Sequence, residues 1–114
     1  MSSLQVIHDF HAAIKNANVE ALYNCFHKKN GTVEAMKKQY EIVFKEFKLD
    51  TQLLSCQKIG EDEVNIVIKD QVKTSKLLGP TFQDNITTNI YVLERGSNNE
   101  WKILSSNLID ITYL

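Results

Sequence analysis

Hydrophobic residues recur every three to four positions up to about Phe47, which predicts amphipathic helices. The pattern is interrupted twice, at Asn16-Ala17-Asn18 and around Gly31, so we expect three helices. Ser2 or Ser3, Asn18 and Thr32 are expected to cap them. The apolar stripes consist of Leu4, Ile7, Phe10, Ile14 and Ala17; of Val19, Leu22, Tyr23 and Phe26; and of Val33, Met36, Tyr40, Val43, Phe44 and Phe47.

From Leu49 onward the spacing of apolar residues changes toward two, which predicts β-strands. Four strands are expected, at residues 49–59, 64–77, 81–94 and 101–113, with turn residues between them. Because helices and strands are segregated, the fold class is α+β. We expect a single domain, residues 1–114, in which three N-terminal helices pack on a strongly curved four-stranded antiparallel sheet, a cystatin-like cone.

Composition narrows the classes of function. The 114 residues carry 13 basic and 14 acidic side chains, a net charge of −1, so no basic footprint for nucleic acid is present. No apolar run reaches the roughly 18 residues of a membrane span, and no charged and apolar leader opens the chain. We therefore expect a cytoplasmic protein that binds neither nucleic acid nor membrane.

The last two predicted strands form a hairpin whose faces depend on its register. Centring its loop near Ser97 and Asn98 pairs Val92 with Ile103, Ile90 with Ser105 and Thr88 with Asn107. One face is then apolar except for Thr88, Ser105 and Asn107. An apolar surface with a few convergent polar groups is typical of a small-molecule pocket.

We predict a pocket on this face, with Asp70 of the second strand as a weak candidate acid or base. Tyr23 is a second weak catalytic candidate, because a tyrosine on an apolar helical stripe can donate to a ligand. The full set expected to line the pocket is Tyr23, Tyr40, Asp70, Thr88, Trp101, Ser105 and Asn107. In the alternative interpretation the tyrosines and Trp101 are core residues and the other polar groups lie at the wet edge of the sheet.

The opposite face of the hairpin is also apolar enough to pair with a second copy. It consists of Thr87, Asn89, Tyr91, Leu93, Leu104 and Leu108. We therefore expect a homodimer that forms through the sheet.

The sequence gives little support for a metal site or a cofactor site. His8 and His11 share a helical face, but no further ligand set accompanies them, so no metal site is expected. Cys25 and Cys56 lie in different elements and are interpreted as small buried or half-buried thiols. The four glycines are scattered, so no phosphate-binding loop and no cofactor are expected.

Three stretches together resemble the nuclear transport factor 2-like superfamily, which includes SnoaL-like proteins and relatives of ketosteroid isomerase. They are residues 15–22 (KNANVEAL), residues 31–36 (GTVEAM) and the hairpin of residues 94–103, whose glycine-containing turn leads into Trp-Lys-Ile. The resemblance implies a cone-shaped α+β fold with a pocket at its open end and frequent dimerisation through the sheet.

The chain departs from catalytic members of the superfamily in one respect. Such members usually carry an acid or base between the second and third helices, and no carboxylate lies between Glu20 and Glu34 here. We therefore expect a non-catalytic module that binds an apolar small molecule or a protein partner as a homodimer. The alternatives are an isomerase, dehydratase or hydrolase using Asp70 or Tyr23, and an accessory domain that docks on a partner through its sheet.

Overall fold

The computed structural model describes residues 3–114, and in this range three helices are followed by four strands. They are α1 (Ser3–Lys15), α2 (Val19–Asn24), α3 (Val33–Glu46), β1 (Lys48–Glu61), β2 (Asn65–Leu78), β3 (Asn85–Arg95) and β4 (Trp101–Tyr113). The order predicted from the sequence is confirmed. Ser3 is already inside α1 and Ser2 lies outside the described residues.

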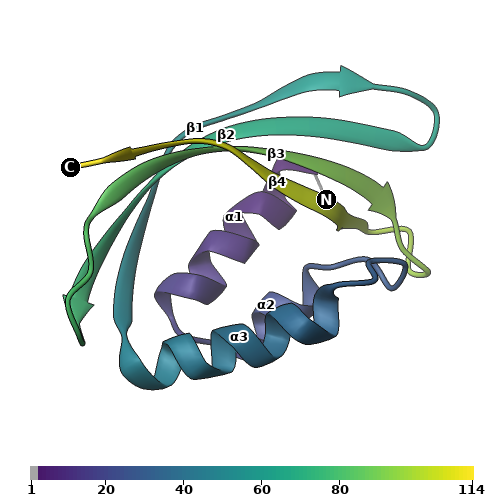
Figure 1. Cartoon of the computed structure of the whole chain (residues 1–114). Coiled ribbons are helices and arrows are strands. Elements are labelled where there is room, and N and C mark those ends of the chain that lie inside the picture. The colour runs from purple at the N-terminus through teal and green to yellow at the C-terminus, as the bar shows by residue number, and fades with distance from the viewer. Residues whose placement is uncertain (1–2) are drawn as a thin grey trace.

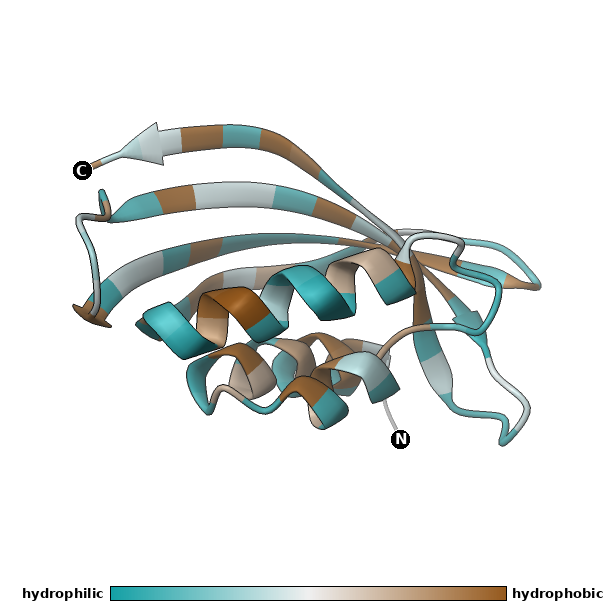
Figure 2. Cartoon of the chain, turned by 60° about the horizontal axis from the view of Figure 1, so that its bottom comes forward, coloured by the Kyte–Doolittle hydropathy of each residue, from teal (hydrophilic) through white to brown (hydrophobic). Residues whose placement is uncertain are grey.

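The strands form one antiparallel sheet in the order β1-β2-β3-β4. The sheet is strongly curved and all three helices lie on its concave side (Figure 1). The strands carry alternating bands of hydrophobic and hydrophilic residues (Figure 2), which is the pattern of strands with one face toward helices. The expected α+β cone is therefore confirmed.

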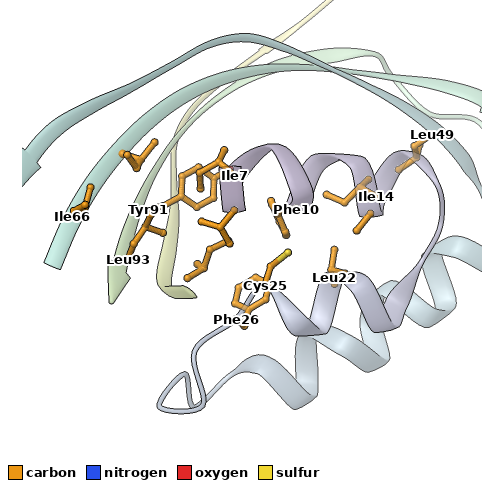
Figure 3. Close-up of a cluster of buried hydrophobic side chains, with 14 residues drawn as sticks. Ile7, Phe10, Ile14, Leu22, Cys25, Phe26, Leu49, Ile66, Tyr91 and Leu93 are labelled. Atoms are coloured by element: carbon orange, nitrogen blue, oxygen red, sulfur yellow. The ribbon is translucent and has the colours of Figure 1, made fainter. Parts of the chain in front are cut away.

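The core fills the space between α1, α2 and the nearer half of the sheet (Figure 3). Ile7 of α1, Leu22 of α2 and Leu93 of β3 belong to this core, and all three are fully buried. Burying a side chain of this size contributes about 1.5–3 kcal/mol. Helix α2 is short, and its start is fixed by Asn18, whose side-chain oxygen accepts a hydrogen bond from the Ala21 amide at 3.0 Å, as predicted.

Helix α3 is held differently, because none of its residues is buried. Its apolar stripe is only half-buried, and the predicted cap Thr32 makes no side-chain bond to the helix. The Thr32 amide instead donates to Asn30 at 2.9 Å. The far end is anchored by Phe47, whose ring packs edge-on against Phe82. Helix α3 is therefore fixed at its ends and stands away from the sheet in its middle.

The predicted register of the β3–β4 hairpin is wrong by two residues at Val92 and Ile90 and by three at Thr88. Val92 pairs with Ser105, and Leu93 pairs with Ile103. Two irregularities in the ladder, one between Val92 and Leu93 and one between Thr88 and Asn89, shift the strands relative to a simple hairpin.

The assignment of the two β3 faces is also wrong. Tyr91 and Leu93 are buried against the helices, so they cannot belong to an outer face. Because successive residues alternate across a strand, Ile90 and Val92 lie on the convex face instead. On β3, the face predicted as a pocket floor is thus the outside of the cone, and the face predicted for dimerisation is the inside.

Candidate functional site

A cavity of about 430 Å³ lies between the concave face of the sheet and helices α1 and α3. It exists because the middle of α3 does not pack onto the sheet. Its lining is Phe10, His11 and Ile14 of α1, Tyr40 of α3, Leu49 and Thr51 of β1, Val72 and Thr74 of β2, Thr87, Asn89 and Tyr91 of β3, and Ser106, Asn107 and Leu108 of β4. Apolar walls with a few hydroxyl and amide groups, in this size range, are what small-molecule sites have.

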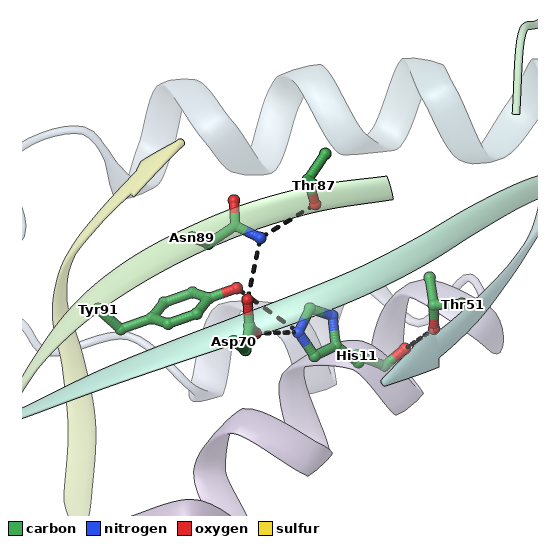
Figure 4. A network of polar contacts seen from close by, with 6 residues as sticks. All are labelled: His11, Thr51, Asp70, Thr87, Asn89 and Tyr91. Carbon is green, nitrogen blue, oxygen red and sulfur yellow. Dashed lines mark hydrogen bonds and ion pairs between the residues drawn. The ribbon is translucent and has the colours of Figure 1, made fainter. Parts of the chain in front are cut away.

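A buried polar network lies under one wall of this cavity (Figure 4). The Nε2 atom of His11 is 2.8 Å from Oδ2 of Asp70, and Nδ2 of Asn89 donates to Oδ1 of the same carboxyl at 3.0 Å. Asp70 is fully buried, so these donors replace the water that the carboxylate loses on folding. Both oxygens of Asp70 are occupied in this way.

The network orients the His11 ring. A carboxylate only accepts hydrogen bonds, so Nε2 carries the proton that points at Asp70. Within residues 3–114, Nδ1 of His11 is the buried side-chain nitrogen or oxygen left without a hydrogen-bond partner.

Tyr91 and Tyr40 bring phenol groups to the cavity. The Tyr91 hydroxyl lies 3.5 Å from Nε2 of His11. Burial, followed by the charge of Asp70, holds the pKa of Tyr91 well above its usual range, and burial also raises the pKa of Tyr40. Both phenols therefore stay protonated and serve as neutral donors rather than as bases.

The structure brings together only part of the predicted pocket. Tyr40 and Asn107 line the cavity, and Asp70 lies directly behind His11 and Asn89 without lining it. Thr88 belongs to the other side of the sheet, where Gln71 donates to its hydroxyl at 3.4 Å. Ser105, which pairs with Val92, is also on the convex side and lines no part of the cavity.

Tyr23 and Trp101 lie in separate hollows. Trp101 lines one of about 400 Å³ between α1 and α2, and the Arg95 guanidinium lies 4.4 Å from the centre of its ring. Tyr23 lines one of about 300 Å³ beside the β3–β4 turn. Its hydroxyl donates to Glu34 at 2.8 Å, and this bond raises the pKa of Tyr23. Neither residue can act together with Asp70.

The residues predicted for a dimer surface are placed mainly inside the cone. Thr87 and Asn89 line the cavity, and Tyr91 and Leu93 are in the core. Leu108 lines the cavity and is also largely exposed, while Leu104 is half-buried. The predicted dimer surface is therefore wrong for the four β3 residues.

Sequence reasoning missed His11 and Tyr91 as site residues. His11 follows Ile7 by four positions and precedes Ile14 by three, so helical spacing places it on the buried face. A histidine there needs a buried partner, and Asp70, which lies among Ile66, Ile68 and Val72 on one face of the strand, was the available acid. This pairing was the signal that could have found the network.

The described part of the chain shows no arrangement of residues suited to a metal site, a reactive thiol or a membrane-spanning helix. In residues 3–114, no group of three or more His, Cys, Asp or Glu side chains could hold a metal ion. Cys25 is buried and Cys56 half-buried, and burial raises the pKa of each thiol to about 11. No helix in this range is both long and apolar enough to cross a membrane.

Comparison with known proteins adds a family and a set of structural neighbours. Residues 5–114 match the family model described as the C-terminal domain of the anti-sigma-I factor RsgI9. No curated protein sequence matches the chain.

Three solved structures illustrate the likeness of fold. A candidate aromatic ring hydroxylase from Novosphingobium aromaticivorans has a TM-score of 0.80 at 10% identity, over 97% of this chain and 90% of its own. A candidate scytalone dehydratase from the same organism has a TM-score of 0.75 at 13% identity, over 95% and 82%. A nuclear transport factor 2-like superfamily protein from Salmonella enterica has a TM-score of 0.76 at 14% identity, over 92% and 85%.

These neighbours confirm the resemblance found in the sequence: the chain has the fold of the nuclear transport factor 2-like superfamily. Their names cover different activities, so at such low identity they show the fold and not a reaction.

Proposed function

Since the chain belongs to the family of the C-terminal domain of anti-sigma-I factor RsgI9, we propose that it is a non-catalytic binding module of a regulatory protein. Its cavity beneath α3 takes up a neutral, largely apolar small molecule. The observation that carries this proposal is a cavity of about 430 Å³ that has no acidic side chain in its lining, next to which the buried Asp70 has both oxygens occupied.

The chemistry of the lining supports a neutral ligand. The apolar walls come from Phe10, Ile14, Leu49, Val72 and Leu108. The polar groups of the lining are hydroxyls, amides and the His11 ring, and no Lys, Arg or Glu is among them. A charged ligand would lose its hydration without gaining an opposite charge, which is costly. A neutral molecule with one or two hydroxyl or carbonyl groups would lose little.

The test uses Nile red, a neutral apolar dye, and two substitutions of adjacent residues. Thr74→Phe fills the cavity, because Thr74 lines it, whereas Ser75→Phe places the same ring on the other side of the sheet. We expect the dissociation constant for Nile red to rise by about 10-fold or more with Thr74→Phe, the equivalent of about 1.4 kcal/mol. Ser75→Phe should bind like the parent. Absence of dye binding by the parent, or equal loss in both variants, would contradict the proposal.

A second candidate function is proton transfer, favoured by the buried His11–Asp70 pair. In this alternative Asp70 orients the ring, and Nδ1 of His11, which is buried in the free protein, is uncovered when the substrate binds and accepts a proton from it. The test is deuterium incorporation next to the carbonyl of a simple cyclic ketone, followed by NMR. Incorporation that disappears with His11→Phe would support this function, and its absence in the parent protein would dismiss it.

We also propose that the module forms a homodimer through its sheet. Support comes from the distribution of large exposed hydrophobic side chains in residues 3–114, five of which lie at residues 108–114. Apolar clusters of this kind on a small domain mark interaction surfaces.

A further inference from the structure

The sheet ends at β4, and the edge of this strand is covered only in its first part. After α2 the chain runs beside β4: the His27 amide donates to the Ile103 carbonyl and the Ile103 amide donates to the Cys25 carbonyl, both at 2.8 Å. Beyond this contact, residues 106–113 are all exposed. This part of β4 therefore presents a row of backbone groups with no strand beside it.

The side chains of this bare edge are unusual for a sheet that ends in water. Large apolar residues are exposed there: Leu108, Ile109, Ile111 and Tyr113. The one charged residue among residues 106–113 is Asp110. Natural proteins normally protect an exposed edge with charged side chains, proline or a short strand, and this edge has little of such protection.

The opposite edge of the same sheet is protected. Strand β1 carries Lys48, Asp50, Lys58 and Glu61, and its pairing with β2 is irregular at three places. Charged side chains discourage the addition of a further strand, and β1 carries four of them where residues 106–113 of β4 carry one. The two edges of the sheet thus differ in their charged side chains. This difference is expected if a partner strand pairs with β4 and none pairs with β1.

We propose that residues 106–113 of β4 pair antiparallel with the same residues of a second copy, so that one sheet continues across the two molecules. This rests on the proposed homodimer and assigns its surface. Two identical edges can pair only around a two-fold axis, which makes the contact closed and limits it to two copies. Because the paired segments carry one acidic residue each, charge repulsion between them is small.

The convex face of the sheet is the competing surface, and it is less suited. Its apolar residues on β2 and β3 are Val67, Ile86, Ile90 and Val92, which are half-buried, and Leu77, which is exposed near the end of β2. They are flanked by Lys69 and Lys73 on β2 and by Glu94 on β3, so the apolar area is divided by charges.

Pairing through β4 would also complete the ligand cavity. Ser106, Asn107 and Leu108 form its wall at the edge of the sheet, and among residues 3–114 no strand pairs with the outer side of β4 there. A partner strand at this place extends the concave floor past Leu108. Ligand binding and dimerisation through β4 are therefore expected to strengthen each other.

The test combines oligomeric state with amide hydrogen exchange. Sedimentation of the whole chain over a range of concentrations gives the dimer dissociation constant. Exchange measured at low and high concentration shows which amides become protected, and we expect protection at residues 106–113 that increases with concentration. Protection confined to other segments would overturn the proposal.

Three isoleucine-to-lysine variants locate the interface. Ile109→Lys is expected to raise the dimer dissociation constant by about 10-fold or more, because a lysine on an edge opposes strand addition. Ile59→Lys places the same change on the β1 edge, at a similarly exposed residue, and should leave the dimer intact. Ile90→Lys on the convex face should also leave it intact. Each side chain is at least partly exposed, so all three variants are expected to fold, as circular dichroism would show.

The outcomes separate the proposals. If Ile90→Lys dissociates the dimer and Ile109→Lys does not, the edge assignment is wrong while the homodimer stands. A chain that is monomeric at all concentrations overturns both. Nile red binding by that monomer would still support the ligand cavity, because dye binding is measured independently of dimerisation.

Discussion

Asp70 is the residue on which the cavity wall depends. It is a fully buried acid that accepts from His11 and Asn89, and the Asn89 amide also donates to Thr87 at 3.0 Å. These contacts connect α1 to β2 and β3 through one carboxyl. Hydrogen bonds from several donors fix the Asp70 carboxyl, and the same bonds fix the donors. The first role of Asp70 is therefore to position His11.

Removing the Asp70 carboxyl should lower the free energy of unfolding, and a second substitution should restore most of what is lost. Asp70→Ala removes the acceptor of the His11 ring and one of the two acceptors of the Asn89 amide, and we expect a loss of roughly 1–3 kcal/mol in the free energy of unfolding. The double variant His11→Phe with Asp70→Leu removes donor and acceptor together and should regain most of that loss. Urea denaturation measures both.

A matched control is available on the surface. Asp50 pairs with Lys15 at 3.3 Å in an exposed position, so Asp50→Ala should cost less than about 1 kcal/mol. If Asp70→Ala were as mild as Asp50→Ala, the carboxyl would not be the anchor of the network.

At this scale the sequence identified the acid and not its partner. Asp70 was recognisable because it interrupts an apolar strand, and a buried charge requires explanation. Tyr91 could not be placed, because β3 carries apolar residues on both faces and alternation alone does not say which face is inside. The helices decide this, through contacts between residues far apart in the chain.

Helix α3 is the element that determines whether a cavity exists. It has no buried residue, and its apolar stripe is only partly buried against the core. At its C-terminal end Phe47 packs on Phe82, and at the other end Lys37 pairs with Glu20 at 3.3 Å and Tyr23 with Glu34. Because the stripe is not fully buried, the side of Tyr40 that faces the sheet stays free to line the cavity.

The anchor at the C-terminal end of α3 depends on Gly79. This glycine has a φ of +124°, and a Cβ placed on it would collide with the backbone carbonyl of Glu46. We expect Gly79→Ala to lower the free energy of unfolding by about 1–3 kcal/mol, because both the backbone angle and the contact become strained. It should also loosen α3, as limited proteolysis would show.

Gly31→Ala is the matched control for this prediction. A Cβ at Gly31 meets no atom within 4 Å, and the backbone there is not in the left-handed region. The change should be close to neutral or slightly stabilising, because alanine restricts the unfolded chain. Equal effects at both glycines would show that the loop at Gly79 does not anchor α3.

The elements themselves were predictable almost in full. Periods of three to four and of two, with the glycine and proline positions, give all the helices and strands found in residues 3–114 with ends displaced by only a few residues. The register of the final hairpin was not predictable, because the two irregularities in β3 and β4 leave no mark in a polarity pattern.

The whole molecule places several weakly acidic groups in a dry interior. Burial raises the pKa of Cys25 and of Cys56 from 9.0 to about 11, and in Cys56 the charge of Asp70 adds to the effect of burial. The pKa of Tyr91 is raised for the same two reasons. All of these groups are neutral in the folded protein at physiological pH.

Such groups make the fold sensitive to alkali. Each has a folded pKa above its unfolded value, so the stability linked to it is complete below the unfolded pKa. It is lost as the pH rises through the folded pKa, because the unfolded chain releases a proton that the folded chain retains. For Cys25 and Cys56 the window runs from about pH 9 to about pH 11.

Alkaline unfolding of the thiol-free chain tests this account. The shift of Cys25 corresponds to roughly 2–3 kcal/mol, and that of half-buried Cys56 contributes less because solvent screens it. We expect the free energy of unfolding, measured in urea between pH 8 and pH 11, to fall more steeply in the parent than in the double variant Cys25→Ala with Cys56→Ala. The variant should begin lower, because Cys25 fills part of the core, and its decline should be shallower while the tyrosines still contribute. Parallel curves would mean that the two thiols ionise alike in the folded and unfolded chains, and that the interior is wetter than the geometry indicates.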